Sequence, residues 1–432
     1  MGFPDVTKLL ERFKDLGATR VFCKHLSEND NSKQQIYLGG SFEVLSFFPF
    51  EAVSEYPGLK EPNFKAQIDL RWIDASTCDR APGAQLILYP KYPEVRLSGF
   101  LEGCKSAPGK YLRPIPKSER KGFDGRVLVF GTTPDKTTFA YLAPAGTAIA
   151  KELHEKCSGN ATDGVFFELT IPIGSIKTRQ ALLNVLRQIH KDGFHWSRKL
   201  DTRGYPQPYK ARNGGGYTLE ALLGVKPNAD ATPDFMGWEI KAYGRDRVTL
   251  MTPEPKGGLY GEKGVEAFVM KYGHDTVDGT KYFTGSHKAN EMSAGSGLTL
   301  IIRGFNVSEK RISDVNGAIC LVDEKGYLAA SWPFSQLIAH WNKKHAYAAY
   351  VPYESNSNPP SYRYQSPVLL GEHTDFQRYL SALSHKAIIF DPGSKVENPG
   401  TSKSKVKARS QFRIGIKNLS LLYKTLTAES IS

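Results

Sequence analysis

The sequence predicts two domains of different class, an N-terminal β-rich domain and a C-terminal α/β domain. The chain has 432 residues, more than one ordinary hydrophobic core contains. Residues 1–172 consist of short apolar segments separated by turn residues, whereas residues 180–432 mix helix-type and strand-type patterns. Apolar residues make up 40% of the chain and aromatic residues 11%, so both parts can bury a core.

The N-terminal part predicts a small barrel or sandwich of about 170 residues. Its candidate strands share β-branched or aromatic residues and are bounded by turn residues. They are Gln35–Gly39, Phe42–Phe47, Gln67–Ile73, Gln85–Tyr89, Arg126–Phe130, Thr138–Leu142 and Val165–Ile171.

In the C-terminal part, leucines at helical spacing predict a helix over Ala181–Ile189, and Thr218 is placed to cap a short helix over Thr218–Leu223. Further helices are expected at Ser335–His345, Asp375–Leu383 and near Leu419–Thr427. Strands are expected at Trp238–Tyr243, Val248–Met251, Leu298–Arg303, Ala318–Val322, Ala346–Val351 and Ala387–Phe390. The polar segments Ser355–Ser361 and Lys395–Lys407 are expected to be loops.

Positive charge is concentrated in the C-terminal part. Residues 1–170 hold 22 Lys and Arg against 21 Asp and Glu, whereas residues 171–432 hold 35 against 23. From Lys395 to Lys424, eight basic residues accompany one acid, Glu397. Such a surface attracts polyphosphates such as nucleic acid, although a merely solubilising basic face has the same composition.

Five scattered cysteines without a C-x-x-C pair argue against a disulfide framework and against a structural zinc site. The sequence contains no stretch of about 18 apolar residues, so no membrane span is predicted. The N-terminus lacks the apolar core of a secretory signal. We therefore expect a cytoplasmic protein without a membrane partner.

One short segment combines acids and a lysine. Residues 232–243 read TPDFMGWEIKAY, and the alternation in this segment predicts a strand. Because side chains alternate faces along a strand, Glu239 and Lys241 point the same way, about 7 Å apart. A turn at Gly237 can return Asp234 to the side of Glu239.

These groups suit magnesium-assisted hydrolysis of a phosphodiester. The carboxylates of Asp234 and Glu239 and the carbonyl of Ile240 are hard oxygen ligands for Mg²⁺, which lowers the pKa of a bound water. Lys241 can orient that water and stabilise the anionic transition state. Glu220, on the short helix before the strand, is a further candidate to contact the metal or Lys241.

Alternatives remain open from the residues alone. A Glu-x-Lys triplet occurs by chance about once in a chain of this size, and the set is then a surface ion pair, with Glu220 a solvated helix acid. A second triplet, Glu254-Pro255-Lys256, is rejected because proline interrupts strand pairing. The run Gly214–Gly216 lacks the following Gly-Lys-Ser/Thr of a nucleotide site.

Basic residues also surround Trp196 in the segment IHKDGFHWSRKLDTRG, residues 189–204. His195, Arg198 and Lys199 are candidates for contact with a DNA backbone. The alternative is a packed corner between a helix and a loop.

The motifs GFHWSRKLD, NGGGYTLEALLG, PDFMGWEIKA and VTLMTPEP resemble the MvaI/BcnI restriction endonucleases over residues 180–432. That resemblance implies a PD-(D/E)xK nuclease fold related to the repair nickase MutH, with a mixed sheet flanked by helices. It implies Asp234, Glu239 and Lys241 as the active site, with Glu220 as an accessory acid. Relatives act as monomers that cut one strand at a time in CC-x-GG sites, and Arg409 and Arg413 are candidates for reading the bases.

Two segments of the N-terminal part, KHLSENDNSKQQIYL (Lys24–Leu38) and YPEVRLSGFLEG (Tyr92–Gly103), resemble the two DNA-clasping arms of a second family. That family is the effector domain of EcoRII, a DNA-binding pseudobarrel also found in plant transcription factors. The carry-over places Lys24, Ser27, Asn29, Asp30 and Gln34 in the first arm, and Glu94, Arg96 and Ser98 in the second. Arginine pairing with guanine and glutamate accepting from cytosine suit a CC/GG site.

Together the two resemblances imply a monomeric type IIE enzyme in which each domain can bind a copy of CC(A/T)GG duplex DNA and the N-terminal copy stimulates cleavage. A DNA reader without catalytic activity and a repair-type nickase are the alternatives.

Overall fold

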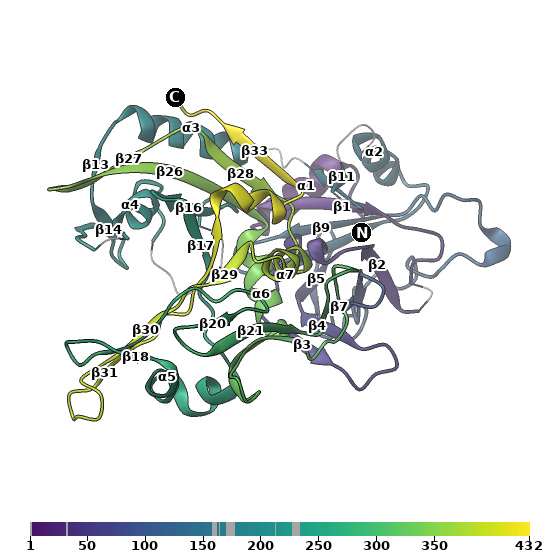
Figure 1. The fold of residues 1–432 in the computed structure, drawn as a ribbon. Coiled ribbons are helices and arrows are strands. Elements are labelled where there is room, and N and C mark those ends of the chain that lie inside the picture. Colours follow the sequence, from purple (N-terminus) through teal and green to yellow (C-terminus); the bar gives the residue numbers. More distant parts are fainter. Residues whose placement is uncertain are drawn as a thin grey trace. The chain divides into compact units, whose positions relative to one another are not determined.

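We describe the protein from a computed structural model, over residues 2–31, 33–157, 162–163, 165–169, 178–211, 213–226 and 234–432. The chain divides into two compact units, Met1–Ile176 and Lys177–Ser432 (Figure 1). The end of the expected strand Val165–Ile171 falls outside the described residues, as do most of the residues between the expected domains 1–172 and 180–432. None of the helices in the described ranges has the length and apolar character of a membrane-spanning segment.

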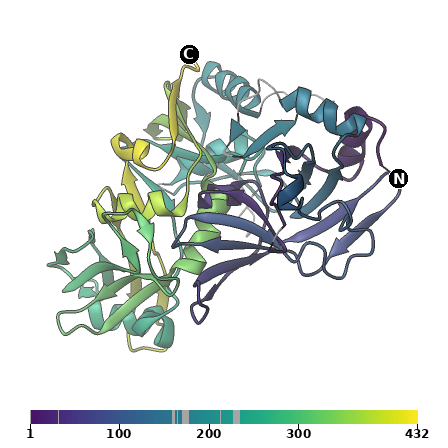
Figure 2. The same ribbon diagram turned by 90° about the vertical axis from the view of Figure 1, so that its right-hand side faces the viewer.

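The N-terminal unit is built on two sheets, whose strands are purple to blue in Figure 2. The first has the order β11 (Thr162–Asp163), β12 (Phe166–Leu169), β1 (Arg20–His25), β9 (Val127–Thr132), β10 (Thr137–Ala143), β5 (Asp69–Ile73) and β6 (Cys78–Ala81). The second has the order β2 (Gln35–Gly39), β8 (Glu94–Ser98), β7 (Gln85–Tyr89), β4 (Asn63–Gln67) and β3 (Val53–Tyr56). All neighbouring pairs are antiparallel except β5 with β10.

Two helices that the strand-based prediction omitted belong to the core of this unit. Helix α1 (Val6–Asp15) begins where the Asp5 side chain accepts a hydrogen bond from the Lys8 amide, and it buries one face at helical spacing. Helix α2 (Ala148–Cys157) joins the same apolar cluster as α1, together with residues of β1, β9 and β10. Each fully buried large apolar side chain in such a cluster stabilises the fold by about 1.5–3 kcal/mol.

The segment Phe42–Ser46 is a 3-10 helix, so the strand expected there is wrong. The Ser41 hydroxyl accepts a hydrogen bond from the Glu43 amide and starts the turn. The alternation of apolar residues in this segment therefore reflects burial of Phe42, Val44 and Leu45 in a turn.

The C-terminal unit has a mixed central sheet. Its order is β13 (His195–Trp196), β27 (Pro360–Tyr364), β26 (Tyr347–Ser357), β28 (Val368–Glu372) and β33 (Thr425–Glu429), and β16 (Glu239–Tyr243) pairs parallel with β26. Helices α3 (Thr178–Lys191) and α4 (Gly214–Leu222) pack on one face of this sheet, where their leucines meet Trp238 and Ile240 (Figure 1). The opposite face of β16 carries Glu239 and Lys241.

The rest of this unit consists of smaller sheets with helices α5 (Gly258–Tyr272), α6 (Phe334–His345) and α7 (Phe376–Ser384). One sheet contains β20 (Met292–Ser293), β21 (Leu298–Arg303), β24 (Ala318–Val322) and β25 (Leu328–Pro333). A second contains β18 (His274–Asp275), β19 (Lys281–Thr284), β30 (Gly393–Glu397) and β31 (Lys405–Lys407). A third contains β17 (Arg247–Met251), β32 (Phe412–Gly415) and β29 (Ile388–Phe390), and two short pairs join β14 (Arg198–Leu200) to β15 (Pro206–Pro208) and β22 (Phe305–Asn306) to β23 (Arg311–Ile312).

Three expectations for this unit are wrong. The expected loop Ser355–Ser361 is the tip of the β26–β27 hairpin, and the expected loop Lys395–Lys407 contains the paired strands β30 and β31. The expected last helix is a 3-10 turn over Ile416–Leu421 followed by strand β33, because pairing with β28 determines the backbone there.

Candidate active site

Strand β16 presents Glu239 and Lys241 on one face. It pairs in register with β26, with Glu239 opposite Ala348 and Lys241 opposite Tyr350. On the other face, Ile240 and the preceding Trp238 are buried in the apolar cluster, which fixes the strand. This alternation agrees with the strand period predicted from the sequence.

Asp234 reaches this strand through a tight turn. The backbones of Phe235 and Trp238 exchange hydrogen bonds of 2.9 and 2.8 Å, and Gly237 has a φ of 88°, a conformation that favours glycine. The Asp234 carboxylate then accepts a hydrogen bond of 2.8 Å from the Ile240 amide. The turn expected at Gly237 is therefore present, and it brings Asp234 to the start of β16.

The Lys241 ammonium lies 2.5 Å from Oε1 of Glu239, whose side chain is 1% exposed. Burial by itself raises the pKa of Glu239, but the surrounding positive charges, that of Lys241 foremost, together outweigh it and leave that pKa below its usual value. Burial acts in the opposite sense on Lys241, and its carboxylate partner keeps the pKa of Lys241 raised. The pair is therefore ionised at neutral pH.

Glu220 joins the group from helix α4. Burial and the negative charge of Asp234 raise the pKa of Glu220 to about 7, and burial and the charge of Glu239 raise the pKa of Asp234. Three carboxyl groups and Lys241 thus share one electrostatic environment. The pKa values of Glu220 and Asp234 are raised because both groups are buried and because like charges lie nearby.

Helix α4 begins earlier than the sequence predicts, at Gly214, so Thr218 lies inside the helix and does not cap it. The Thr218 hydroxyl instead donates to the Arg198 carbonyl and accepts from the Arg198 amide, which ties α4 to β14. The glycine run has a packing role, since a Cβ on Gly215 would lie 2.5 Å from the ring of Tyr353.

Two residues that the sequence analysis missed complete the site. The Lys344 ammonium, near the end of α6, lies 3.8 Å from Oε1 of Glu239. His345 is buried, its Nε2 donates to the Leu250 carbonyl, and burial lowers its pKa to about 3, so the ring is neutral. No local pattern links these residues to the distant Glu239 segment.

The donor set fits a hard divalent cation. Glu239 Oε2 is buried and has no hydrogen-bond partner, which leaves one carboxylate oxygen of the site unsatisfied. Carboxylate and carbonyl oxygens are the ligands that Mg²⁺ prefers. Within the described ranges, no three His, Cys, Asp or Glu side chains are already arranged to hold one ion. The rejected triplet around Pro255 forms no strand.

The two segments expected to form DNA arms lie side by side in the N-terminal unit, because β2 pairs with β8. Ser27, Asn29 and Gln34 are exposed, and Glu94, Arg96 and Ser98 are partly exposed along one face of β8. Arg96 contacts Glu94 at 2.9 Å and donates to the Gln35 side chain at 3.3 Å.

Lys24 and Asp30 lie in the interior of this unit. Their side chains form an ion pair of 2.8 Å and are 4% and 6% exposed. Asp30 also accepts from the amides of Ser27 and Tyr37. This ion pair shapes the first segment from inside, and its burial assigns Lys24 and Asp30 a structural role.

The basic candidates of the C-terminal unit differ in their surroundings. His195 is buried, and its Nε2 donates to the Ile189 carbonyl at 2.8 Å. It therefore belongs to a packed corner between helix α3 and the following strand, as the alternative interpretation of this segment expected. Arg198 and Lys199 are partly exposed on β14. Arg409 is exposed, whereas Arg413 is held by Asp391 at 2.7 Å.

A comparison with protein-family models matches residues 183–423 to the MvaI/BcnI restriction endonuclease family. The match contains the segment from Glu220 to Lys241 and covers more than half of the chain. The chain belongs to the MvaI/BcnI restriction endonuclease family. Membership of this family supports sequence-specific cleavage of DNA by the chain. A comparison with curated proteins finds no match.

Solved structures of restriction endonucleases resemble parts of the chain. MvaI in complex with its cognate DNA covers 58% of this chain and 97% of its own, at 20% identity and a TM-score of 0.45. MvaI without DNA covers 59% and 98%, at 15% identity and a TM-score of 0.33. The B3 domain of the UbaLAI restriction endonuclease, with cognate DNA, covers 38% and 95%, at 20% identity and a TM-score of 0.22.

Proposed function

We propose that the chain is a magnesium-dependent type IIE restriction endonuclease whose active site consists of Asp234, Glu239 and Lys241, assisted by Glu220. The observation that supports this most is the convergence of an acid pair and an ammonium group on β16, within the segment matched to the nuclease family. The alternative of an isolated surface ion pair does not account for the burial of Glu239 or for its unsatisfied oxygen.

In this proposal Asp234, Glu239 and the Ile240 carbonyl hold Mg²⁺, which when bound supplies a water of lowered pKa and neutralises charge on the phosphate. Lys241 orients the attacking water and stabilises the developing negative charge on the phosphate oxygens. The Ile240 amide fixes the Asp234 carboxylate, so that its orientation does not depend on the metal. The buried side chains of Trp238 and Ile240 anchor the strand in the apolar cluster.

The N-terminal unit is proposed to bind a second copy of the target duplex, CC(A/T)GG, and to stimulate cleavage. Its contacts are the exposed polar residues of the first arm and the row Glu94, Arg96 and Ser98 on the second. Arg96 is suited to guanine because its fork of donors matches two guanine acceptors, and Glu94 is suited to cytosine because it can accept from the amino group. In the free protein the two side chains neutralise each other.

A plasmid assay tests the proposal directly. The purified chain is incubated with a plasmid that carries one CC(A/T)GG site, with Mg²⁺, with and without a chelator. We expect linear product only when Mg²⁺ is present, with ends that map to that site, and faster cutting when a cognate oligonucleotide duplex is added. A plasmid that stays intact overturns the nuclease proposal, and a product that stays nicked favours a nickase. Cutting that the oligonucleotide does not accelerate removes the effector claim alone.

A further inference from the structure

A long connection joins β8 to β9 in the N-terminal unit. Residues 99–126 contain only a single 3-10 turn, Lys117–Glu119, whereas most connections are about 4–6 residues long. Loops of this length without regular structure are usually functional when they are ordered. In Figure 1 this segment is the slate-blue loop that projects from the two sheets of its unit.

The loop carries the positive charge that the N-terminal unit as a whole lacks. Residues 104–126 hold seven Lys and Arg against two Asp and Glu, whereas the rest of residues 1–170 holds 15 against 19. Five of the loop cations have exposed side chains, and none of these five forms an ion pair within the described residues. They are Lys105, Lys110, Arg113, Lys117 and Lys121.

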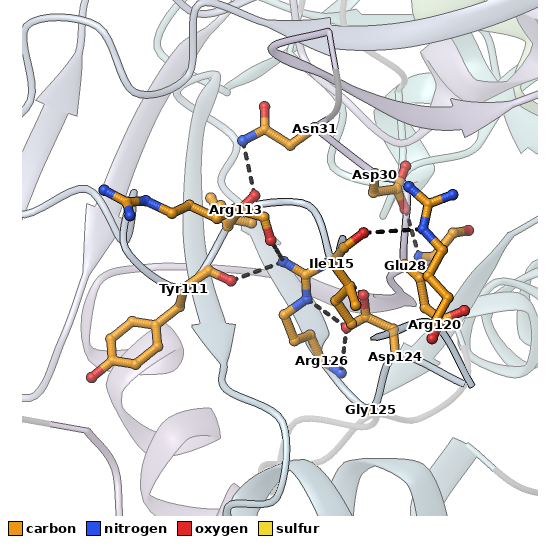
Figure 3. Close-up of polar contacts among 12 residues, drawn as sticks. Glu28, Asp30, Asn31, Tyr111, Arg113, Ile115, Arg120, Asp124, Gly125 and Arg126 are labelled. Atoms are coloured by element: carbon orange, nitrogen blue, oxygen red, sulfur yellow. Dashed lines mark hydrogen bonds and ion pairs between the residues drawn. The ribbon is translucent and has the colours of Figure 1, made fainter. Parts of the chain in front are cut away.

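Buried polar contacts hold the loop in one conformation (Figure 3). The Arg126 guanidinium is paired with the buried Asp124 and donates to the carbonyls of Tyr111 and Arg113 at 2.9 and 3.0 Å. Arg120 donates to the Ile115 carbonyl at 3.0 Å. Hydrogen bonds to charged groups are stronger than those between neutral groups, so this network fixes the loop backbone.

The same loop is fastened to the first arm. The Glu28 carboxylate accepts from the amides of Lys121 and Gly122 at 2.6 and 3.0 Å, and the Glu28 carbonyl accepts from the Ile115 amide at 2.9 Å. The Asn31 side chain donates to the Leu112 carbonyl at 2.9 Å. Glu28 lies between two exposed arm residues, Ser27 and Asn29, so the loop cations and the arm belong to one ordered surface.

We propose that this basic loop, residues 104–126, binds the phosphate backbone of the duplex that the first arm reads. The inference rests on the proposed DNA binding of the N-terminal unit and adds the electrostatic part of it. Base-reading residues supply sequence choice, whereas phosphate contacts supply most of the affinity and carry no sequence information. A unit with nearly equal numbers of acids and bases can bind a polyanion when its cations are grouped in this way.

Chemical labelling of lysines in the full chain tests the inference without reference to cleavage. The protein is acetylated in a chelating buffer, with and without a cognate CC(A/T)GG duplex, and each lysine is quantified by mass spectrometry. We expect the duplex to slow acetylation of Lys110, Lys117 and Lys121 at least threefold. The exposed Lys14, Lys60 and Lys151 of the same unit are the controls and should react at unchanged rates. Equal rates for the loop lysines with and without duplex overturn the inference.

A pair of matched triple variants measures the contribution to binding. Lys110→Gln/Lys117→Gln/Lys121→Gln and the control Lys14→Gln/Lys60→Gln/Lys151→Gln remove the same charge. The readout is the concentration of oligonucleotide duplex that half-maximally stimulates cleavage, measured over a range of salt. Each lost phosphate contact lowers the slope of log affinity against log salt by about 0.9, so the loop variant should lose about 2–3 units of slope and the control none.

The outcomes separate this inference from the proposed function. The oligonucleotide can stimulate cleavage while the loop lysines stay unprotected and the two triple variants have equal salt slopes. That result overturns the role of the loop and leaves the effector proposal in place. Protected lysines without any stimulation support the loop as a DNA surface and remove the effector claim.

Discussion

The ammonium nitrogen of Lys344 lies 3.8 Å from Oε1 of Glu239, the same oxygen that Lys241 contacts at 2.5 Å. Glu239 is therefore neutralised from two elements, its own strand and the end of α6. A second cation at this position can stabilise charge on a bound phosphate once the carboxylate is engaged by a metal.

We expect Lys344→Gln to lower the cleavage rate about 10–100-fold while duplex binding in a chelating buffer stays within a few-fold of the wild type. Single-turnover cleavage and a gel-shift titration measure the two quantities. Lys325→Gln, an exposed lysine of the same unit, is the control. A Lys344 variant that cuts at the wild-type rate shows that this lysine only balances charge in the free protein.

Glu220 makes stability depend on pH. Its pKa is raised from 4.5 to about 7 by burial and by Asp234, so the folded state holds a proton that the unfolded state has already released. The corresponding stability is present below pH 4.5 and is lost as the pH rises through 7. In metal-free buffer we therefore expect Glu220→Gln to gain about 2–3 kcal/mol relative to wild type between pH 5 and pH 8.

Urea unfolding at several pH values measures this difference, and Glu262→Gln on the exposed side of α5 is the control. A constant difference between Glu220→Gln and wild type across the range contradicts the shared electrostatic environment of the three carboxyl groups.

A variant of Lys24 distinguishes a structural role of this residue from a role in contacting DNA. Its ion pair with Asp30 is buried, and removing one partner of such a pair costs about 3–5 kcal/mol because the other charge stays buried alone. We expect Lys24→Ala to destabilise the N-terminal unit by about that amount in urea unfolding. Unchanged stability combined with lost stimulation by the oligonucleotide would instead identify Lys24 as a direct contact.

Arg96 tests the second arm. We expect Arg96→Ala to abolish stimulation of cleavage by a cognate oligonucleotide, because a bidentate arginine–guanine contact contributes about 1–3 kcal/mol of discrimination. Basal cleavage of a one-site plasmid should stay near its wild-type rate. Arg80→Ala is the matched control, since Arg80 is a 65% exposed arginine of the same unit. If the oligonucleotide still stimulates cleavage by the Arg96 variant, residues other than Arg96 read the bases.

The sequence predicts the candidate site where its geometry is local. The period of a strand places Glu239 and Lys241 on one face, and a single turn returns Asp234 to them. Lys344 could not be predicted, because it reaches Glu239 only through the parallel pairing of β16 with β26 and the helix that precedes β26.

The errors in the fold have a common cause. The hairpins at Ser355–Ser361 and Lys395–Lys407 are polar and rich in turn residues, so their sequences are typical of loops, yet backbone pairing makes them strands. The helix expected near Leu419–Thr427 overlaps strand β33, and Leu419, Leu422 and Tyr423 are apolar at helical spacing. These three side chains are indeed buried, but the residues after them are extended because β33 pairs with β28.

Cleavage by two lysine variants tests the central claim most directly. Lys241→Ala removes the ammonium beside Glu239, whereas Lys256→Ala removes the exposed lysine of the other Glu-x-Lys triplet. With Mg²⁺ and a one-site plasmid, we expect Lys241→Ala to lose at least about a hundredfold in rate with duplex binding retained, and Lys256→Ala to match the wild type. Equal cutting by the two variants would contradict the assignment of catalysis to β16.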